Sequence, residues 1–275
     1  KLSRSWTANW GGREVIHTLG LQTRYDRLDP VGLYTAVLGA RDQVTQESRL
    51  SERALGLYAQ TDLAWNEAVR TVFGWRADHV DVDVDSSIAE NSGSRSDWIH
   101  SPKLALILSP WDRTEVFASA GYGFHSNDAR GMTARVTARG GEPIDPAVPL
   151  VRSRGTELGL RNEWLPGLQS SLAIWQLKLD SELVFVGDAG ETEPNGGSQR
   201  RGIEFNNHYV LNQHWMLDLD LAWSRARFDE IQGDEPNAGR HVPGSVQRVA
   251  ALGITFNDLG PWFGQLQLRY FGPRP

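Results

Sequence analysis

The stretch HWMLDLDLAW, residues 214–223, places two opposite chemistries on alternate positions. Its apolar series is Trp215, Leu217, Leu219, Leu221 and Trp223. The intervening positions include two carboxylates, Asp218 and Asp220. Because a β-strand sends successive side chains to opposite faces, this segment has one apolar and one acidic face. A soluble sheet would bury the apolar face in a core, whereas a membrane barrel would turn it toward lipid and the acids toward a wet interior.

Composition limits the class of protein. The chain has 275 residues, which corresponds to one large or two ordinary domains. It has no cysteine, so disulfides and thiolate chemistry are excluded, and its net charge of −6 argues against a nucleic-acid partner. The apolar runs, such as LALIL at 104–108, are too short for a transmembrane helix. The chain does not start with Met or with an apolar signal core, so we expect a piece of a longer mature protein.

Segments that alternate between apolar and polar residues recur along the chain, with turn-forming residues between them. This pattern predicts an all-β fold of about twelve antiparallel strands. The clearest alternating segments are 54–65, 68–78, 156–164, 201–210 and 262–270.

The connections alternate in length. Short turns are expected at 11–13, 66–67, 110–113, 166–167, 211–213 and 257–261. Long polar loops are expected at 29–48, 85–96, 125–150, 188–198 and 230–245. Because antiparallel strands put successive connections at opposite ends of the sheet, one end should carry only tight turns and the other only long loops. That asymmetry is typical of outer-membrane barrels.

Tryptophan positions favour the same fold. Indole combines an apolar body with an N–H group, so it prefers the boundary between hydrocarbon and lipid headgroups. A tryptophan lies beside each short turn: Trp10, Trp65, Trp111, Trp164, Trp215 and Trp262. We expect these six to form a membrane girdle. Candidates for the opposite girdle are Trp75, Trp175, Trp223, Tyr122 and Tyr270. A soluble sandwich with a Trp-rich core is the alternative, but it gives no reason for a tryptophan at every short turn.

The alternating pattern also predicts which side chains face each solvent. The outward set is Leu55, Leu57, Leu217, Leu219, Leu221, Leu266 and Leu268. The set predicted to face the concave interior is Arg70, Arg76, Asp218, Asp220, Gln267 and Arg269.

Several motifs, in their order and spacing, resemble the C-terminal barrel of TonB-dependent outer-membrane receptors. They are ALGLYAQTDLAW at 54–65, PKLALILSPWDRTEVFASAGYGF at 102–124, RRGIEFNNHYV at 200–210 and VPGSVQRVAALGITF at 242–256. The resemblance covers most of residues 50–272. It implies an antiparallel up-and-down transmembrane β-barrel, of which residues 1–275 form a part. We expect the family's plug domain and final strands to be absent from these residues, which end in RYFGPRP.

The resemblance also implies a function. Such a receptor lies in the bacterial outer membrane, binds a scarce ligand, commonly a ferric siderophore or similar metal chelate, and imports it with energy delivered through TonB. It is not an enzyme and carries no cofactor. Its expected partners are outer-membrane lipid, lipopolysaccharide, the small-molecule ligand and the TonB complex, the last through the absent N-terminal part. A barrel enzyme such as a lipase and a soluble β-rich binding or adhesion module stay open as alternatives.

The candidate ligand-binding residues are arginines. Ferric siderophores are often anionic, so arginine could hold one through charge-assisted hydrogen bonds. The long loop from His125 to Pro149 ends in a glycine- and proline-rich stretch typical of a mobile cover. A solvated loop that binds lipopolysaccharide phosphates or nothing is the alternative. The candidates are Arg130, Arg135 and Arg139 in this loop, with Arg70 and Arg76 on the predicted interior wall.

The sequence predicts no metal site and no catalytic site. Asp81, Asp83 and Asp85 alternate with valines, but DVDVD lacks the glycine and terminal glutamate of an EF-hand calcium loop. Val80, Val82 and Val84 occupy the register that is polar lower in the same strand. Either the membrane constraint ends there, or a β-bulge intervenes. No serine has a nucleophile elbow around it.

Overall fold

The computed structural model describes residues 1–186, 191–230 and 239–274, and their main element is one large antiparallel sheet. Its strands are joined in the order β1-β2-β3-β4-β6-β7-β8-β9-β12-β13-β14-β15, so nearly every strand pairs with its neighbour in sequence. The strands are β1 (Leu2–Trp10), β2 (Arg13–Val37), β3 (Ala40–Asn66), β4 (Val69–Ser86), β5 (Gly93–His100), β6 (Lys103–Trp111), β7 (Thr114–Ser126), β8 (Leu150–Leu165), β9 (Leu168–Leu179), β12 (Ser198–Val210), β13 (Trp215–Phe228), β14 (Arg248–Leu259) and β15 (Trp262–Phe271).

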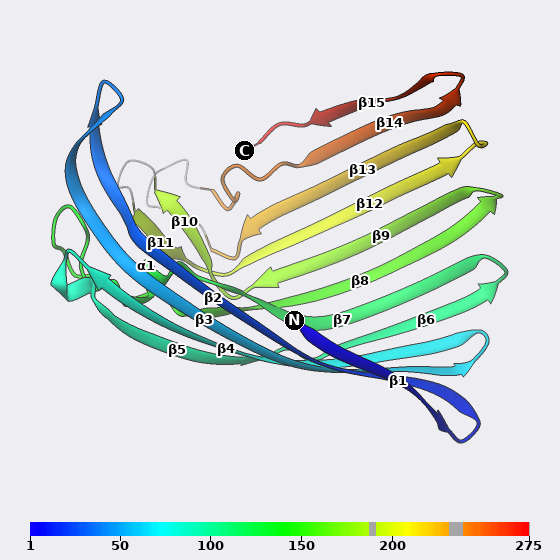
Figure 1. The fold of residues 1–275 in the computed structure, drawn as a ribbon, viewed down its shortest axis with the longest axis horizontal. Helices are drawn as coiled ribbons and strands as arrows, with labels where there is room; N and C mark the ends of the chain where they lie inside the picture. The colour runs from blue at the N-terminus through cyan, green and yellow to red at the C-terminus, as the bar shows by residue number, and fades with distance from the viewer. Residues whose placement is uncertain (187–190, 231–238, 275) are drawn as a thin grey trace.

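The sheet is curved into a trough whose two edges are β1 and β15 (Figure 1). Among the described residues it holds 13 strands, but β5 pairs only with β4 and continues the line of β6. Ser101 keeps the ladder intact across the break: its N–H donates to Arg76 O at 2.8 Å, and Arg76 N–H donates back at 3.2 Å. Pro102 lies at the break between β5 and β6, and it has no N–H group to donate to the ladder. The prediction of about twelve antiparallel strands is confirmed.

All six predicted short turns lie where expected, between β1 and β2, β3 and β4, β6 and β7, β8 and β9, β12 and β13, and β14 and β15. They share one end of the sheet, on the right in Figure 1. The all-β, barrel-type fold inferred from the alternating segments is therefore the observed one.

The predicted long loop at 29–48 is wrong. β2 and β3 continue through it as a paired hairpin that ends in a two-residue turn, Leu38 and Gly39, both with positive φ (52° and 81°). Tyr34 Oη donates to Glu47 Oε2 at 3.0 Å across this hairpin, and the Arg41 guanidinium lies 4.1 Å from the Tyr34 ring centroid. Cross-strand pairs of this kind hold an extended arm together without the apolar alternation that lipid imposes. The end opposite the short turns therefore also carries a tight turn.

The remaining connections at that end are longer. The predicted loop at 85–96 shortens to 87–92, which includes η1 (Ala89–Asn91). The connection 127–149 contains α1 (Ala129–Thr133). β10 (Glu182–Val186) and β11 (Glu191–Asn195) form a separate hairpin between β9 and β12. Parts of the predicted loops 188–198 and 230–245 lie outside the described residues. Neither described helix is long and apolar enough to cross a membrane.

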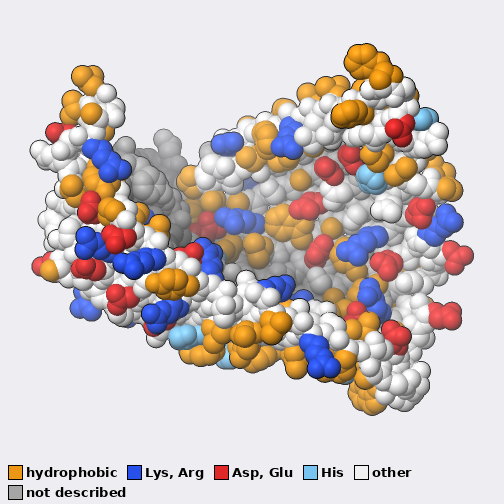
Figure 2. All heavy atoms as spheres, viewed as in Figure 1, with side chains coloured by type: hydrophobic (Ala, Val, Ile, Leu, Met, Phe, Trp, Pro, Cys, Tyr) orange, Lys and Arg blue, Asp and Glu red, His pale blue; other side chains and the backbone are white. Residues whose placement is uncertain are grey.

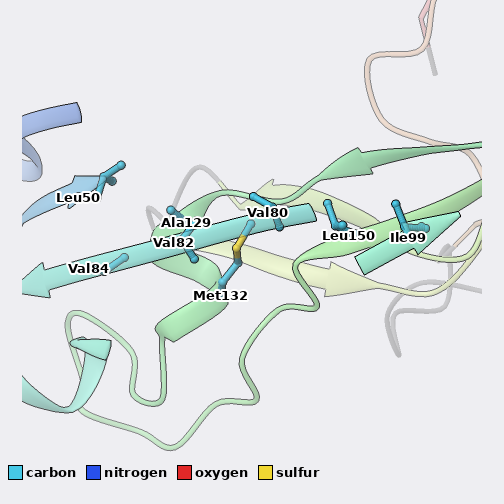
Figure 3. Close-up of a cluster of buried hydrophobic side chains, with 8 residues drawn as sticks. All are labelled: Leu50, Val80, Val82, Val84, Ile99, Ala129, Met132 and Leu150. Carbon is cyan, nitrogen blue, oxygen red and sulfur yellow. The ribbon is translucent and has the colours of Figure 1, made fainter. Parts of the chain in front are cut away.

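The main buried cluster lies at this loop end, where β4 meets the 127–149 connection (Figure 3). Its centre is the valine series Val80, Val82 and Val84, which are 3%, 0% and 3% exposed. The β3–β4 register has no shift from Ser48 to Ala64, so the bulge alternative for the change of polarity is wrong. The valines stay on the face that is polar lower down, and other residues cover them. The full cluster is Leu50, Val80, Val82, Val84, Ile99, Ala129, Met132 and Leu150.

Candidate ligand-binding site

The pairing register places the charged side chains of several strands on one face. Asp218 is opposite His208 on β12 and Gly253 on β14, and residues directly opposite in an antiparallel pair share a face. Asp220 is opposite Asn206 and shares its row with Arg269 of β15. Figure 2 shows that the trough is hollowed and that acidic and basic side chains gather in the hollow. This charged face is the concave wall.

The leucine series lies on the opposite face. Leu219 pairs with Leu252, which pairs with Leu268 on the next strand. Leu268 is 67% exposed and Leu266 is 69% exposed, so this part of the face is an uncovered apolar surface. The predicted segregation of leucines from carboxylates is confirmed by the register.

The six tryptophans at the short turns are a second feature of that end of the sheet. Five are strongly exposed, from 43% at Trp65 to 71% at Trp111 and Trp262, and Trp215 packs against Phe256 at a centroid distance of 5.7 Å. Trp65 Nε1 donates to Thr71 Oγ1 at 2.9 Å, which satisfies its N–H group.

The predicted second girdle needs one correction. Trp75, Trp223, Tyr122 and Tyr270 fall in the leucine register, but Trp175 does not. Trp175 is opposite Glu157 on β8 and Gly202 on β12, so it lies on the concave wall. Gly202 has no side chain, which leaves the space that the indole occupies.

Both arginines predicted for the interior wall lie on it, and both are paired with acids. Arg70 Nη1 lies 3.1 Å from Asp62 Oδ2. Arg76 makes a forked contact with Asp78 at 2.5–2.9 Å, and its Nη1 donates to Gln22 Oε1 at 3.5 Å. Val84 lies fourteen positions after Arg70 in β4, so about 45 Å of strand lies between Arg70 and the loop end. The structure therefore does not bring Arg70 together with the loop arginines.

A polar hollow lies on the concave side close to the short turns. Its volume is about 720 Å³. His208 Nδ1 lies 2.7 Å from Asp218 Oδ1, and Arg161 lies 3.7 Å from Glu115. The residues that line it include four carboxylates, Glu115, Glu163, Asp218 and Asp220, against two arginines, so the hollow is hydrophilic with an excess of acids.

The long connection 127–149 begins with a capped turn of helix. Asp128 Oδ1 accepts from Arg130 N at 2.9 Å, and Arg130 Nη2 donates to Asp128 Oδ2 at 2.7 Å. Burial by itself raises the pKa of Asp128, but its hydrogen bonds with Arg130 and the charge of that guanidinium outweigh this, so the pKa of Asp128 is lowered. The same partner raises the pKa of Arg130. Much of the Arg130 charge is therefore compensated locally.

The sequence suggested a mobile cover rather than a buried element, but part of this connection is buried. Met132 is 0% exposed and enters the cluster around Val82 (Figure 3). Arg95 Nε donates to Met132 O at 3.3 Å, and Asn127 Nδ2 donates to Val148 O at 2.7 Å. Burial of the Met132 side chain against the valines of β4 stabilises the docked conformation, even though the connection is rich in glycine and proline.

Arg135 and Arg139 remain exposed on this docked connection. Within the described part of the chain the Arg135 guanidinium has no hydrogen-bond or ion-pair partner. Its backbone N–H donates to Asn91 Oδ1 at 2.8 Å. Asn91 and Met132 were not predicted as site residues, although the apolar series Val80, Val82 and Val84 on a polar face indicated that another residue covers it.

No three His, Cys, Asp or Glu side chains of the described ranges come together as metal ligands. Asp83 Oδ2 accepts from Ser94 Oγ at 2.7 Å on the face opposite the valines.

This architecture is similar to that of known proteins. The family model described as "TonB dependent receptor-like, beta-barrel" matches residues 1–275. No curated protein sequence matches the chain. Similar solved structures include the ferric citrate transporter FecA in the unliganded form (TM-score 0.70, 16% identity, 98% of this chain and 40% of that chain). The ferric yersiniabactin uptake receptor FyuA from Yersinia pestis is also similar (TM-score 0.70, 13% identity, 99% and 42%). A third is the copper transporter OprC (TM-score 0.68, 16% identity, 98% and 42%). The chain thus spans about two fifths of the length of these proteins.

Proposed function

The chain belongs to the TonB-dependent receptor β-barrel family of outer-membrane proteins, and we propose that it is part of a receptor that imports a ferric siderophore or similar metal chelate with energy coupled through TonB. The family consists of transport receptors rather than enzymes, so the barrel-lipase alternative receives no support. Family membership excludes the soluble-module alternative. Residues 1–275 are then one part of the barrel, and the plug domain and remaining strands belong to the full-length receptor.

The observation that carries the proposal is the docked 127–149 connection at the loop end of a polar concave wall. It presents Arg135 and Arg139 to solvent, where a ligand arriving from outside first meets the protein. Iron(III) chelates with carboxylate or catecholate groups are often anionic, and guanidinium groups bind such oxygens with charge-assisted hydrogen bonds. Two of the similar structures are named for ferric chelates and one for copper, which supports a metal chelate as the ligand class.

The contribution of the other candidate arginines differs. Arg130 is held by Asp128, and Arg70 and Arg76 are held by acids on the wall. We assign first contact with the ligand to Arg135, which is exposed at the loop end, and we place Arg76 deeper on the path of the ligand. Arg70, close to the short turns, is the last of the set.

The apolar convex face and its tryptophans support membrane contact at two levels. The six tryptophans at the short turns form the inner girdle of the proposal, and Trp75, Trp223, Tyr122 and Tyr270 form the outer one. Outer-membrane lipid covers the leucine face between them. Lipopolysaccharide contacts the convex surface above the outer girdle.

The test uses the full-length receptor in a Gram-negative strain that lacks its own siderophore receptors. Iron-55 is supplied as citrate, tricatecholate and trihydroxamate complexes, and cell-associated iron is measured with and without TonB. We expect uptake of at least one complex that disappears without TonB, while binding to the cell surface persists. Equal uptake in the two strains, or binding of none of the three complexes, would contradict the proposal.

A further inference from the structure

Asn91, in the short connection between β4 and β5, is hydrogen-bonded through its side chain to the 127–149 connection. Its side chain is 2% exposed. Nδ2 donates to Val136 O at 3.0 Å, and Oδ1 accepts from Arg135 N at 2.8 Å and from Val136 N at 3.0 Å. Three of the four hydrogen bonds available to an asparagine amide are thus made to one dipeptide of the 127–149 connection.

The turn that carries Asn91 is itself braced against two strands. Ser92 Oγ accepts from Ser86 N at 2.9 Å and donates to Ser86 O at 3.3 Å, which closes the turn at its base. Ser87 N donates to Glu47 O at 2.7 Å, and Ser87 Oγ accepts from Glu47 N at 3.0 Å. Asn91 is therefore fixed relative to β3 and β4.

The dipeptide that Asn91 holds is the base of a small hairpin. Ile144 N donates to Arg135 O at 2.9 Å, Val136 bridges Pro143, and Thr137 N donates to Glu142 O at 2.8 Å. Arg139 lies near the tip of this hairpin, within residues 137–141. Its base carries Arg135, whose guanidinium is exposed.

The other anchors of the connection act at other points. Arg95 holds Met132 O, three residues before Arg135. Asn127 holds Val148 O, where the connection enters β8. Within the described residues, the side chain of Asn91 is the one whose hydrogen bonds reach both N–H groups of the dipeptide.

We infer that Asn91 is a positioning residue of the ligand site: it does not touch the ligand, but it sets the place from which Arg135 does. This inference rests on the proposed function, because it requires Arg135 to bind an anionic chelate. A guanidinium whose backbone is already fixed loses less conformational freedom on binding, so its fixation strengthens binding without adding a contact. Loss of that fixation is expected to weaken binding about three- to tenfold.

The test is a double-mutant cycle in the full-length receptor, in outer-membrane vesicles, with the three iron-55 complexes as probes. Four proteins are compared: wild type, Asn91→Ala, Arg135→Ala and the double variant. We expect Asn91→Ala to weaken binding three- to tenfold in the wild-type background and to have no effect once Arg135 is removed. The same loss in both backgrounds would show that Asn91 acts as general support for the fold and would overturn the inference.

The matched control is Asn127→Ala, which removes a buried asparagine and one hydrogen bond from the same connection. It should leave affinity unchanged, and a loss equal to that of Asn91→Ala would overturn the inference. Asn91→Asp keeps the acceptor for both N–H groups and loses the donor, so it should restore part of the affinity lost in Asn91→Ala. No recovery in the Asn91→Asp variant would count against the hydrogen-bond mechanism.

Amide hydrogen exchange separates failure of the inference from failure of the proposed function. In Asn91→Ala the amides of Arg135 and Val136 should exchange faster, while those of β4 should not change. Unchanged exchange at Arg135 and Val136 would overturn the positioning role even if a chelate binds. Faster exchange with no binding of any probe to the wild type would instead overturn the proposed function, and the ligand role of Asn91 with it.

Discussion

The indole of Trp175 lies directly over Gly202 on the concave wall. A Cβ atom added to Gly202 would lie 2.5 Å from Cζ2 of that indole and 2.8 Å from the carbonyl oxygen of Trp223. Nε1 of Trp175 is buried and has no hydrogen-bond partner among the described residues. The concave wall accommodates Trp175 because Gly202, its neighbour on β12, has no side chain that would occupy the same space.

Gly202→Ala is expected to destabilise the barrel by about 1–3 kcal/mol, because the added methyl group meets both a packed ring and the backbone. The measurement is urea unfolding of the full-length receptor in detergent micelles. Gly155→Ala is the control, since the same Cβ there would have its nearest neighbour, Leu177 Cδ1, at 4.0 Å. Similar losses in the two variants would mean that the Trp175 contact is not the cause.

Leu219→Arg is expected to cost about 2–4 kcal/mol if the residue lies near the bilayer midplane, because it puts a charge into hydrocarbon. Asp220→Arg, one residue along β13, should cost much less because Asp220 is exposed on the concave wall. Unfolding in lipid vesicles measures both. Comparable losses at the two neighbours would contradict the assignment of the leucine face to lipid.

The sequence was most informative where the membrane constrains it. Alternation such as that around Asp218 predicted the faces of the strands, and turn-forming residues between the alternating segments, each with a tryptophan beside it, predicted the six short turns. Alternation is typical of a strand with an apolar surround on one face and water on the other, and tryptophan is typical of the boundary between them. They are absent from the β2–β3 arm at 29–48, and that arm was predicted as a loop.

Contacts between loops were beyond the reach of the sequence. Met132 and Asn91 lie 41 residues apart on different connections, and neither residue type has a local pattern that indicates docking. The valines at 80–84 were the one indication of docking, because an apolar series on a water-filled face is stable only when other residues bury it. Trp175 was assigned to the wrong face for a related reason: a single aromatic residue does not reveal that a glycine lies opposite.

Met132→Ala is expected to weaken docking of the 127–149 connection by about 2–5 kcal/mol, through lost burial and the cavity left beside Val82. Amide exchange at residues 129–133 should become much faster, while the strands should stay protected. Met216→Ala makes the same change at a half-buried position on β13 and is the control. Protection at 129–133 as strong as in the wild type would mean that Met132 does not anchor the loop.

Docking of the same connection is expected to depend on pH. The pKa of Asp128 is lowered in the folded state, so its pairing with Arg130 contributes stability that is complete above the ordinary value of 3.8 and is lost as pH falls through the lowered value. A nitroxide attached at Thr137→Cys should therefore keep a constant mobility from pH 7 to about pH 4 and become more mobile below that. Glu52 of β3 also interacts with Asp128 and titrates in acid. Asp128→Asn separates the two carboxylates: it should raise mobility at pH 7 and remove most of the change in acid, and an unaltered pH profile would assign the effect to another group.

Arg135→Ala is expected to weaken binding of an anionic iron(III) chelate, and the loss should depend on salt. The guanidinium is exposed and has no ion-pair partner among the described residues, so none of those residues competes with the ligand for its charge. A charge-assisted hydrogen bond contributes about 1.5 kcal/mol or more, which corresponds to roughly tenfold in affinity. At 1 M salt the screening length falls to about 3 Å, so the difference between wild type and variant should shrink.

Arg130→Ala is the comparison, because Asp128 already holds that guanidinium at 2.7 Å and its removal should cost less affinity. The measurement is binding of the three iron-55 complexes to full-length receptor in vesicles at 0.05 M and 1 M salt. Equal affinity of wild type and Arg135→Ala at both salt concentrations, with an intact barrel, would remove Arg135 from the ligand site.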